Sequence, residues 1–225
     1  MTDTLERELK LVPASEALLD QLAGIDRLGP FEVRGHHREA QLNSFFDSRS
    51  GGLRQARVGF RRRTIEGDRL ATWSIKGDAR HVGAVATRAE IELRLDADMP
   101  PALALSALRD AARTRGASAL SEAVSDALAS GGLPLAQPVL ETRTDRRIVD
   151  LSESEHHWDI ELALDRMELL GHAYHEVEIE AELKRGDLAA LDAIHTAIAT
   201  LGMVSESHDS KLSRALAHLD GCECR

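Results

Sequence analysis

The chain has 225 residues, of which 43% are hydrophobic, 29% are charged and 3% are aromatic. This composition can bury a core and excludes a disordered chain. The formal net charge of −10 argues against a general nucleic-acid binder, because such proteins need a basic face. No apolar run is long enough to span a bilayer, and the first residues lack the basic-then-apolar order of a signal peptide, so we expect a soluble cytoplasmic protein with no membrane partner.

The strand signal is an alternation of apolar and polar residues with a period of two. In chain order this alternation covers residues 4–11, 40–48, 56–64, 70–77, 87–95, 139–149, 157–165 and 173–183. Residues 31–35 either begin a further strand or extend the second one. A helical region separates the strands over about 4–95 from those over about 139–183, and it could divide one sheet or two domains. We favour one sheet in a single domain over residues 1–225, because three strands alone would bury little apolar surface.

Helical periodicity marks the start, the centre and the end of the chain. Ser15 is a suitable N-cap for the first helix and Asp187 for the fourth. The expected helices cover residues 15–25, 101–116, 118–132, 186–202 and 210–221. They form a helical insertion over about 101–133 and C-terminal helices over about 186–220.

The two cysteines, Cys222 and Cys224, lie within the last four residues. Two cysteines this close in the chain cannot form a disulfide that links distant parts of the fold. Two thiols alone also make an incomplete metal site. We interpret both as part of a frayed tail.

The polar faces of the predicted strands carry charges of both signs. The stretch HEVEIEAELK places a glutamate at every second position, namely Glu176, Glu178, Glu180 and Glu182. Similar faces carry Glu6, Glu8 and Lys10, then Arg61 and Arg63, then Arg88, Glu90, Glu92 and Arg94, and then Asp159, Glu161 and Asp165. One solvated face of an antiparallel sheet would explain any single strand. Carboxylates at this spacing repel one another and raise each other's pKa, so the whole set requires a compensating arrangement.

A closed barrel with its charged face inward supplies that compensation. Residues that face the lumen of a barrel alternate with outward residues along every strand, so the apolar faces would point outward and be covered by the helices. Glutamates from several strands could converge on divalent metal ions. Arginines and lysines could hold the oxygens of a polyanion. In this interpretation the glutamates of residues 175–184 form one acidic wall of a charged tunnel.

The motif Glu-x-Glu-x-Lys, formed by Glu6, Glu8 and Lys10, resembles the signature of the CYTH domain in the triphosphate tunnel metalloenzyme superfamily. The resemblance covers about residues 4–215. It continues, in order, with the segments SFFDS, VGFRRR, WSIKG, RAEIE, ETRTDRR, IELALD, HEVEIEAELKRG and SHDSKLSRAL. Each motif is weak alone, and their order and spacing together are specific.

The resemblance implies an α+β fold that is mainly β, an eight-stranded antiparallel closed barrel forming a tunnel, with helices packed on the outside. It implies a triphosphate-containing small molecule as ligand and Mg²⁺ or Mn²⁺ as cofactor. The chain departs from the family pattern at Phe45, where a tyrosine is common, and at Arg62, where an apolar residue is usual. The helical insertion is also longer than a minimal member needs.

The resemblance further implies hydrolysis of a terminal phosphoanhydride, with inorganic triphosphate as the leading substrate. The residues expected to bind phosphate are Arg61, Arg63, Lys76, Arg88, Arg143, Arg147 and Lys211. The expected metal ligands are Glu6, Glu8, Glu90, Glu92, Glu161, Glu178 and Glu180, with Asp165 as a further candidate. The residues assigned to catalysis are Glu6, Glu8, Lys10 and Lys76. No side-chain nucleophile is required, because phosphoryl transfer depends mostly on positioning and charge stabilisation.

Other charged residues are expected to have no part in the site. We expect Arg62 and Arg94 to be charges on the surface or at the rim of the barrel. We expect Arg146 to pair with Asp145 or Asp150 on the outside of the barrel. Triphosphate and Mg²⁺ prefer cationic and oxygen partners. We therefore expect exposure without a ligand at four histidines, His36, His37, His156 and His157.

Three alternatives to an inorganic triphosphatase stay open. Thiamine triphosphatase would favour aromatic contacts, and the chain has only two Trp, one Tyr and four Phe. Adenylate cyclase needs a purine pocket, for which no residues stand out. A non-catalytic polyphosphate or nucleotide sensor would keep the basic residues without an effective metal site, and the intact acidic pairs argue against it. The sequence also leaves a homodimer open.

Overall fold

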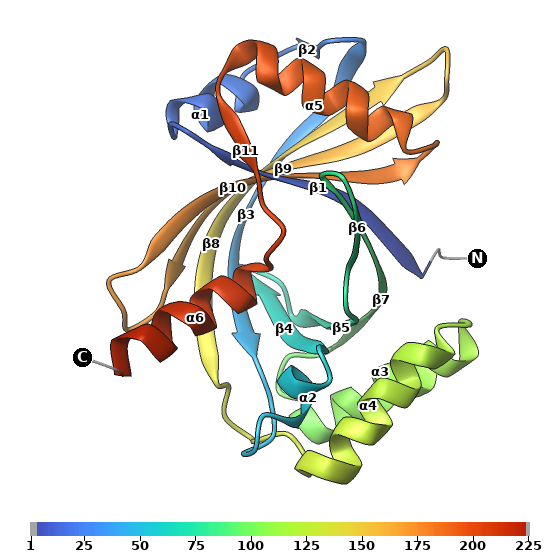
Figure 1. The fold of residues 1–225 in the computed structure, drawn as a ribbon, viewed down its shortest axis with the longest axis vertical. Helices are drawn as coiled ribbons and strands as arrows, with labels where there is room; N and C mark the ends of the chain where they lie inside the picture. The colour runs from blue at the N-terminus through green and yellow to red at the C-terminus, as the bar shows by residue number, and fades with distance from the viewer. Residues whose placement is uncertain (1–3, 224–225) are drawn as a thin grey trace.

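The computed structural model describes residues 4–223 and shows a closed barrel of eight long strands (Figure 1). The strands are β1 (Leu5–Pro13), β3 (Phe31–Phe45), β4 (Gly59–Ile65), β5 (Leu70–Lys76), β7 (Val85–Asp96), β8 (Leu140–Glu153), β9 (Trp158–Leu169) and β10 (His175–Arg185). Their order around the ring is β1-β10-β9-β8-β3-β4-β5-β7, and β7 pairs with β1 to close it. Every pairing in the ring is antiparallel. The predicted eight-stranded antiparallel barrel is confirmed.

Within residues 4–223, shorter elements surround this ring. The short strands β2 (Arg27–Leu28), β6 (Arg80–Val82) and β11 (Val204–Glu206) pair with β3, β7 and β1. The helices are α1 (Ala17–Ala23), α2 (Gly52–Gln55), α3 (Pro101–Thr114), α4 (Ser118–Gly131), α5 (Ala189–Leu201) and α6 (Lys211–Glu223). The sequence did not predict the short strands or α2, because each is too short to show a periodic pattern. Residues 31–35 belong to the second long strand, since β3 begins at Phe31.

The last helix extends slightly beyond the expected range of 210–221. α6 continues to Glu223, so the backbone of Cys222 is helical, and the interpretation of the cysteines as a frayed tail stays a prediction. Cys224 lies outside the described residues. None of the helices over residues 4–223 combines the length and the apolar character that crossing a membrane requires.

The apolar side chains of the strands point outward and pack against helices, which lie around the barrel in Figure 1. On one side, α1 and α5 pack on β1, β8, β9 and β10 in a core that includes Leu11 and Ile194. On the other side, α3 and α4 cover β4, β5 and β7, and here Phe46, Phe60 and Trp73 lie with ring centroids 5.6 Å apart. Since side chains alternate along a strand, this outward burial turns the charged faces into the lumen.

Leu11→Ala tests this orientation, because Leu11 is fully buried in the core under α1 and α5. We expect the free energy of unfolding to fall by about 2–5 kcal/mol, measured by urea denaturation followed by circular dichroism. The matched control is Leu70→Ala at the start of β5, where the side chain is 44% exposed. The control should change stability by no more than about 0.5 kcal/mol. Equal losses in the two variants would contradict an outward apolar face on β1.

Candidate functional site

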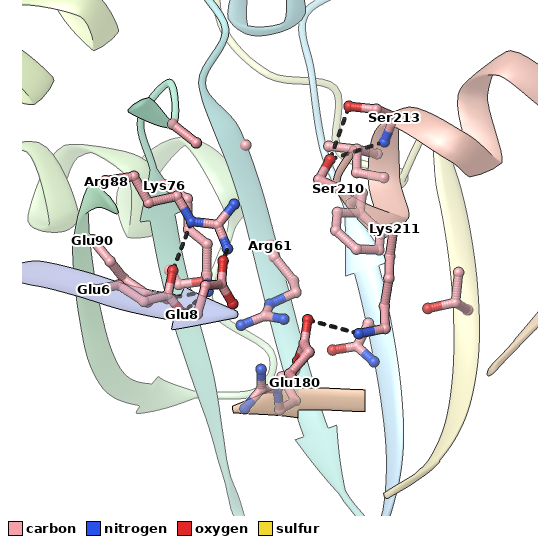
Figure 2. Close-up of a pocket in the computed structure, with 18 of the residues that line it drawn as sticks. Glu6, Glu8, Arg61, Lys76, Arg88, Glu90, Glu180, Ser210, Lys211 and Ser213 are labelled. Atoms are coloured by element: carbon pink, nitrogen blue, oxygen red, sulfur yellow. Dashed lines mark hydrogen bonds and ion pairs between the residues drawn. The ribbon is translucent and has the colours of Figure 1, made fainter. Parts of the chain in front are cut away.

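The lumen of the barrel holds a cavity of about 1070 Å³ whose walls carry charged side chains of both signs (Figure 2). All eight long strands contribute to its lining, together with α2, the β6 region and the first turn of α6. Many of the charged residues come from the inward positions of strands whose other face is packed against helices, and others come from connecting segments, α2 and α6. The alternation of each strand therefore concentrates ionised groups in one enclosed space.

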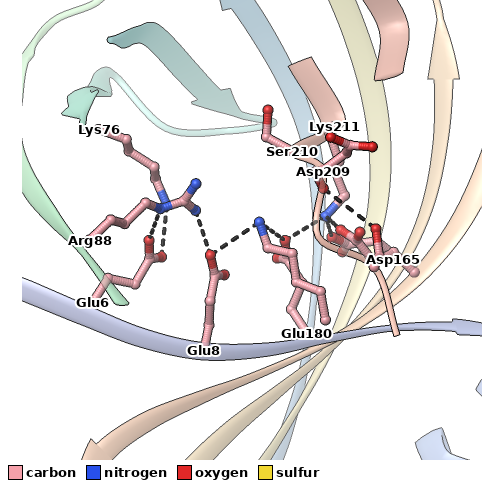
Figure 3. Close-up of polar contacts among 12 residues, drawn as sticks. Glu6, Glu8, Lys76, Arg88, Asp165, Glu180, Asp209, Ser210 and Lys211 are labelled. Atoms are coloured by element: carbon pink, nitrogen blue, oxygen red, sulfur yellow. Dashed lines mark hydrogen bonds and ion pairs between the residues drawn. The ribbon is translucent and has the colours of Figure 1, made fainter. Parts of the chain in front are cut away.

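One side of the cavity is a network of two glutamates and two cations (Figures 2 and 3). The Nζ of Lys76 donates to Oε1 of Glu6 at 2.7 Å, and Arg88 Nε donates to Oε2 of the same carboxylate at 2.6 Å. Arg88 also donates through Nη2 to Glu8 Oε1 at 2.6 Å. Burial opposes ionisation of Glu6, yet Lys76 and Arg88 outweigh it and hold the pKa of Glu6 below its usual range. Glu6 is therefore a buried carboxylate at neutral pH.

Lys10 joins this network to a second group of charges. Its Nζ lies 3.1 Å from Glu8 Oε1 and 3.8 Å from Glu180 Oε1. Arg146 Nη2 lies 2.6 Å from Glu180 Oε2 and 2.6 Å from Asp165 Oδ2. Despite burial, Arg146 and a lysine from α6 keep the pKa of Asp165 low. Positive and negative groups thus alternate across the lumen.

The α6 lysine is Lys211, the first residue of that helix. The N-terminus of α6 is fixed by Ser210, whose Oγ accepts a hydrogen bond from Ser213 N at 3.0 Å (Figure 2). Lys211 Nζ lies 2.8 Å from Glu180 Oε1 and 2.9 Å from Asp165 Oδ2 (Figure 3). The cap thus places one ammonium group between carboxylates of β9 and β10.

Arg61 and Arg63 on β4 line the same cavity with donors that are not used. Nε and Nη2 of Arg61 and Nε of Arg63 are buried and make no hydrogen bond. Arg61 Nη2 is 3.5 Å from the nearest carboxylate oxygen, on Glu92. Burial, Arg61 and Arg146 lower the pKa of Arg63 to about 10. Buried donors without acceptors are uncommon, so this wall is suited to an anion that brings its own oxygens.

Glu90 is a carboxylate whose charge is only partly compensated by its neighbours. Its Oε2 is 3.1 Å from Lys76 Nζ, while its Oε1 is buried without a hydrogen-bond partner. Burial raises the pKa of Glu90 to about 8; nearby Glu6 and Glu92 add to the rise and Lys76 opposes it. A free carboxylate oxygen beside other glutamates is a donor set that Mg²⁺ and Mn²⁺ prefer. The residues present therefore fit a divalent cation.

Most of the residues predicted for the site meet in this cavity. Those that line it are Glu6, Glu8, Lys10, Arg61, Arg63, Lys76, Arg88, Glu90, Glu92, Glu161, Asp165, Glu180 and Lys211. Glu161 lies 3.5 Å from Lys184, which also pairs with Glu182 at 2.7 Å. The roles of these residues in binding and catalysis stay predictions. The four histidines expected to be exposed are exposed.

The placement of the β8 arginines corrects the sequence-based expectation. Arg143 and Arg147 lie on the outer face, where Arg143 pairs with Glu168 and Arg147 pairs with Asp20 of α1, each at 2.7 Å. Arg146, expected outside, is the arginine that lines the lumen. The reason is the strand's alternation, which follows the outer-core residues Val149 and Leu151 at odd positions. Those two residues were the available signal for the correct face.

The four glutamates of β10 fall into two groups: one pair lines the cavity and the other pair contacts α6. Glu180 and Glu182 line the cavity. Glu178, expected to bind metal, is fully buried and does not line it; its Oε1 accepts a bond from Arg214 Nη2 of α6 at 2.8 Å, and Lys211 contacts its other oxygen. Arg214 also binds Glu176 through Nε at 2.8 Å. The first two glutamates of the row therefore anchor α6, and the sequence carried no sign of this long-range contact.

Arg146→Met tests the corrected face of β8. The substitution leaves the buried Asp165 and Glu180 with one cation fewer, so we expect a loss of about 3–5 kcal/mol in the free energy of unfolding. The control, Arg143→Met, removes an exposed pair with Glu168 and should cost no more than about 1 kcal/mol. Urea denaturation of both variants measures the difference. A small effect at position 146 would argue that Arg146 is not a buried partner.

Glu90→Gln should change how stability depends on pH. The folded chain has a Glu90 pKa of about 8, whereas an unfolded glutamate has a pKa of about 4.3. Between these values the folded state keeps a proton that the unfolded state releases, so stability falls as pH rises through this window. With EDTA present, the variant should lose this part of the fall and exceed the wild type at pH 8 by at least about 1 kcal/mol. Identical pH profiles from urea denaturation would refute this assignment.

The architecture has counterparts among solved structures. An adenylyl cyclase candidate from Hippeastrum, described as having a dominant triphosphatase activity, is 20% identical with a TM-score of 0.65, and the match covers 92% of this chain and 93% of that one. An adenylate cyclase candidate from Bacillus halodurans is 18% identical with a TM-score of 0.53, covering 94% and 98%. A protein from Pyrococcus horikoshii OT3 is 16% identical with a TM-score of 0.56, covering 95% and 99%. At these identities the likeness supports the fold alone.

The sequence comparisons address the family directly. A search of the curated proteins found no match for this chain. The family model of the CYTH domain matches residues 4–213. Because this match covers nearly the whole chain and the barrel has the expected form, the protein belongs to the CYTH domain family of the triphosphate tunnel metalloenzyme superfamily.

Proposed function

We propose that this protein hydrolyses the terminal phosphoanhydride of inorganic triphosphate with a divalent cation, Mg²⁺ or Mn²⁺. The observation that carries the proposal is that two parts of the cavity wall hold buried polar atoms without hydrogen-bond partners. Arg61 and Arg63 present buried donors without acceptors, and Glu90 presents a buried oxygen that makes no hydrogen bond. A triphosphate bound together with a divalent cation supplies both missing partners.

The cations of the lumen would bind the phosphate chain. Arg61 and Arg63 are placed to donate to phosphate oxygens, because their free N–H groups line the cavity. Lys76, Arg88 and Lys211 now neutralise carboxylates. They could share those bonds with the phosphates once a metal ion takes over part of the carboxylate charge. Arg146, held by two acids, would remain a fixed positive charge at the same wall.

The carboxylates would hold the metal ion. Glu90, with its free oxygen, together with Glu6, Glu8 and Glu180 offers an all-oxygen donor set. When bound, such an ion neutralises phosphate charge and favours attack of water on phosphorus. The enclosed lumen limits bulk water and strengthens each of these electrostatic contacts. Hydrolysis would break the bond between the terminal phosphorus and the bridging oxygen, and the cations around the lumen would stabilise the charge on the departing pyrophosphate.

The lining favours a substrate without an aromatic ring. Among the described residues that line the cavity, the only phenyl, phenol or indole rings are those of Phe45 and Phe46. Phe46 is 4% exposed and packs in the outer core against Phe60 and Trp73. No broad aromatic surface is therefore available to stack on a nucleobase or a thiamine ring. The dominant triphosphatase activity ascribed to the Hippeastrum relative is in line with a triphosphate substrate.

The test is phosphate release from tripolyphosphate, thiamine triphosphate and ATP, each with Mg²⁺ or Mn²⁺. We expect tripolyphosphate to give the highest kcat/KM, and EDTA to abolish turnover. Glu8→Gln should lower kcat/KM at least about 100-fold, because it removes one of the carboxylate charges that face the metal and the phosphates. The matched control is Glu168→Gln on the outer face of β9, which should retain wild-type turnover.

Each other outcome identifies an alternative. Preference for thiamine triphosphate or formation of cyclic AMP from ATP would replace the proposal by another member activity of this fold. Tight binding of tripolyphosphate without hydrolysis would indicate a sensor. Wild-type kinetics in Glu8→Gln would remove Glu8 from the catalytic site, provided circular dichroism shows the variant to be folded.

A further inference from the structure

Two histidines from distant parts of the chain meet at the edge of the cavity. His81 lies in β6, and His208 lies in the segment between β11 and α6 (Figure 1). Their Nδ1 atoms are 3.4 Å apart, and the rings are nearly perpendicular, with an interplanar angle of 89°. Both side chains line the cavity and are exposed to solvent. The barrel therefore brings the Nδ1 atoms of two imidazole rings close together at the edge of the cavity.

The separation of these nitrogens suits a shared metal ion. Two ligands that bind Zn²⁺ at about 2.0–2.1 Å with a tetrahedral angle lie roughly 3.3–3.4 Å apart. As a hydrogen bond, 3.4 Å is longer than the range of about 2.7–3.2 Å that N–H donors prefer. The observed 3.4 Å contact is thus close to ideal for two metal ligands and poor for two imidazoles alone.

A carboxylate faces the second nitrogen of His208. Glu206 Oε2 lies 4.0 Å from His208 Nε2. Histidines that bind metal through one nitrogen commonly direct the other nitrogen to a carboxylate, which fixes the tautomer and raises ligand basicity. A small movement of this exposed pair would complete that contact. At 4.0 Å the pair makes no hydrogen bond in this structure, so Glu206 is a nearby carboxylate that metal binding would draw onto His208.

The backbone on both sides of the pair is held in place. His81 pairs with Ala86 in the β6–β7 hairpin. On the other side, Ser207 N donates to Lys10 O at 3.0 Å, and Arg214 Nη1 donates to Asp209 O at 2.7 Å. The two imidazoles thus approach each other from anchored segments, so little ordering is left to oppose the binding of an ion.

We propose that His81 and His208 bind one borderline transition-metal ion, with Zn²⁺ the best fit and water completing its coordination. Imidazole suits Zn²⁺, whereas carboxylate oxygens suit Mg²⁺ and Mn²⁺, so this site is chemically distinct from the lumen glutamates. The ion joins the β6–β7 hairpin to the segment that leads into Lys211. It thereby holds together two walls of the cavity opening, and it does so whether or not the lumen hydrolyses triphosphate.

The experiment is isothermal titration of ZnCl₂ into the full chain with millimolar Mg²⁺ present to occupy the oxygen-rich lumen. We expect one Zn²⁺ per chain at the tightest site. His81→Ala and His208→Ala should each weaken this site by more than about tenfold, and Glu206→Gln should weaken it by about tenfold. Thermal melting curves establish that each variant is folded.

The matched control is His156→Ala. His156 forms an acidic group with Glu153 and Glu155 whose possible ligand atoms lie within 4.8 Å of one another, so it is a competing location for Zn²⁺. This variant should bind Zn²⁺ as the wild type does. Loss of the tight site in His156→Ala, or unchanged affinity in both His81→Ala and His208→Ala, overturns the proposal.

Hydrogen exchange gives a second readout that does not depend on affinity. Zn²⁺ should slow amide exchange in residues 78–85 and 206–211 of the wild type and leave these rates unchanged in His81→Ala. Equal slowing in the variant would place the ion elsewhere and would contradict the proposed site.

Discussion

The pairing of charges inside a closed barrel is the constraint on which the structure depends. A buried ion without a partner costs several kcal/mol, and the lumen removes many ionised groups from bulk water at once. Positive and negative side chains alternate across the cavity and offset this cost. Glu6 contacts Arg88, Arg88 contacts Glu8, and Glu8 contacts Lys10. The apolar faces cannot relieve this cost, because α1, α3, α4 and α5 already cover them. The inward charges and the outer helices are two consequences of one strand pattern.

Where this pairing is incomplete, the fold shows what it lacks. Arg61 and Arg63 keep free donors, and Glu90 keeps a free oxygen and a raised pKa. Arg61 and Arg63 lie on β4 and Glu90 lies on β7, with β5 between these strands, and their free atoms make no hydrogen bond to one another. A ligand that carries negative oxygens and arrives with a cation satisfies both. The unpaired groups therefore say more about the ligand than the well-paired ones, whose contacts also stabilise the barrel.

The strands that could be oriented from sequence are those with one apolar and one charged face. β1, β7 and β10 have this form, so Glu8, Glu90 and Glu180 were assigned to the correct side. In β8 the residues from 141 to 147 are polar on both faces, and the pattern becomes readable only at Val149 and Leu151. Contacts between segments far apart in the chain leave no local pattern at all, so the binding of α6 to β10 and the approach of β6 to the segment before α6 required the structure.

The α6 region connects the charged lumen to the proposed histidine site at the cavity opening. Arg214 pairs with Glu176 and Glu178, and Lys211 contacts both Glu178 and Glu180, so Glu180 is the glutamate of the row that joins the α6 contacts to the lumen network. The cationic side chains of α6 thus pair with the first glutamates of β10, and the proposed metal ion would bind at Glu180. His208 stands three residues before Lys211, on the same anchored approach to the helix. Any ion held by His208 would fix the position from which Lys211 enters the lumen, so an imidazole site at the opening and an oxygen site inside are mechanically connected through one short segment.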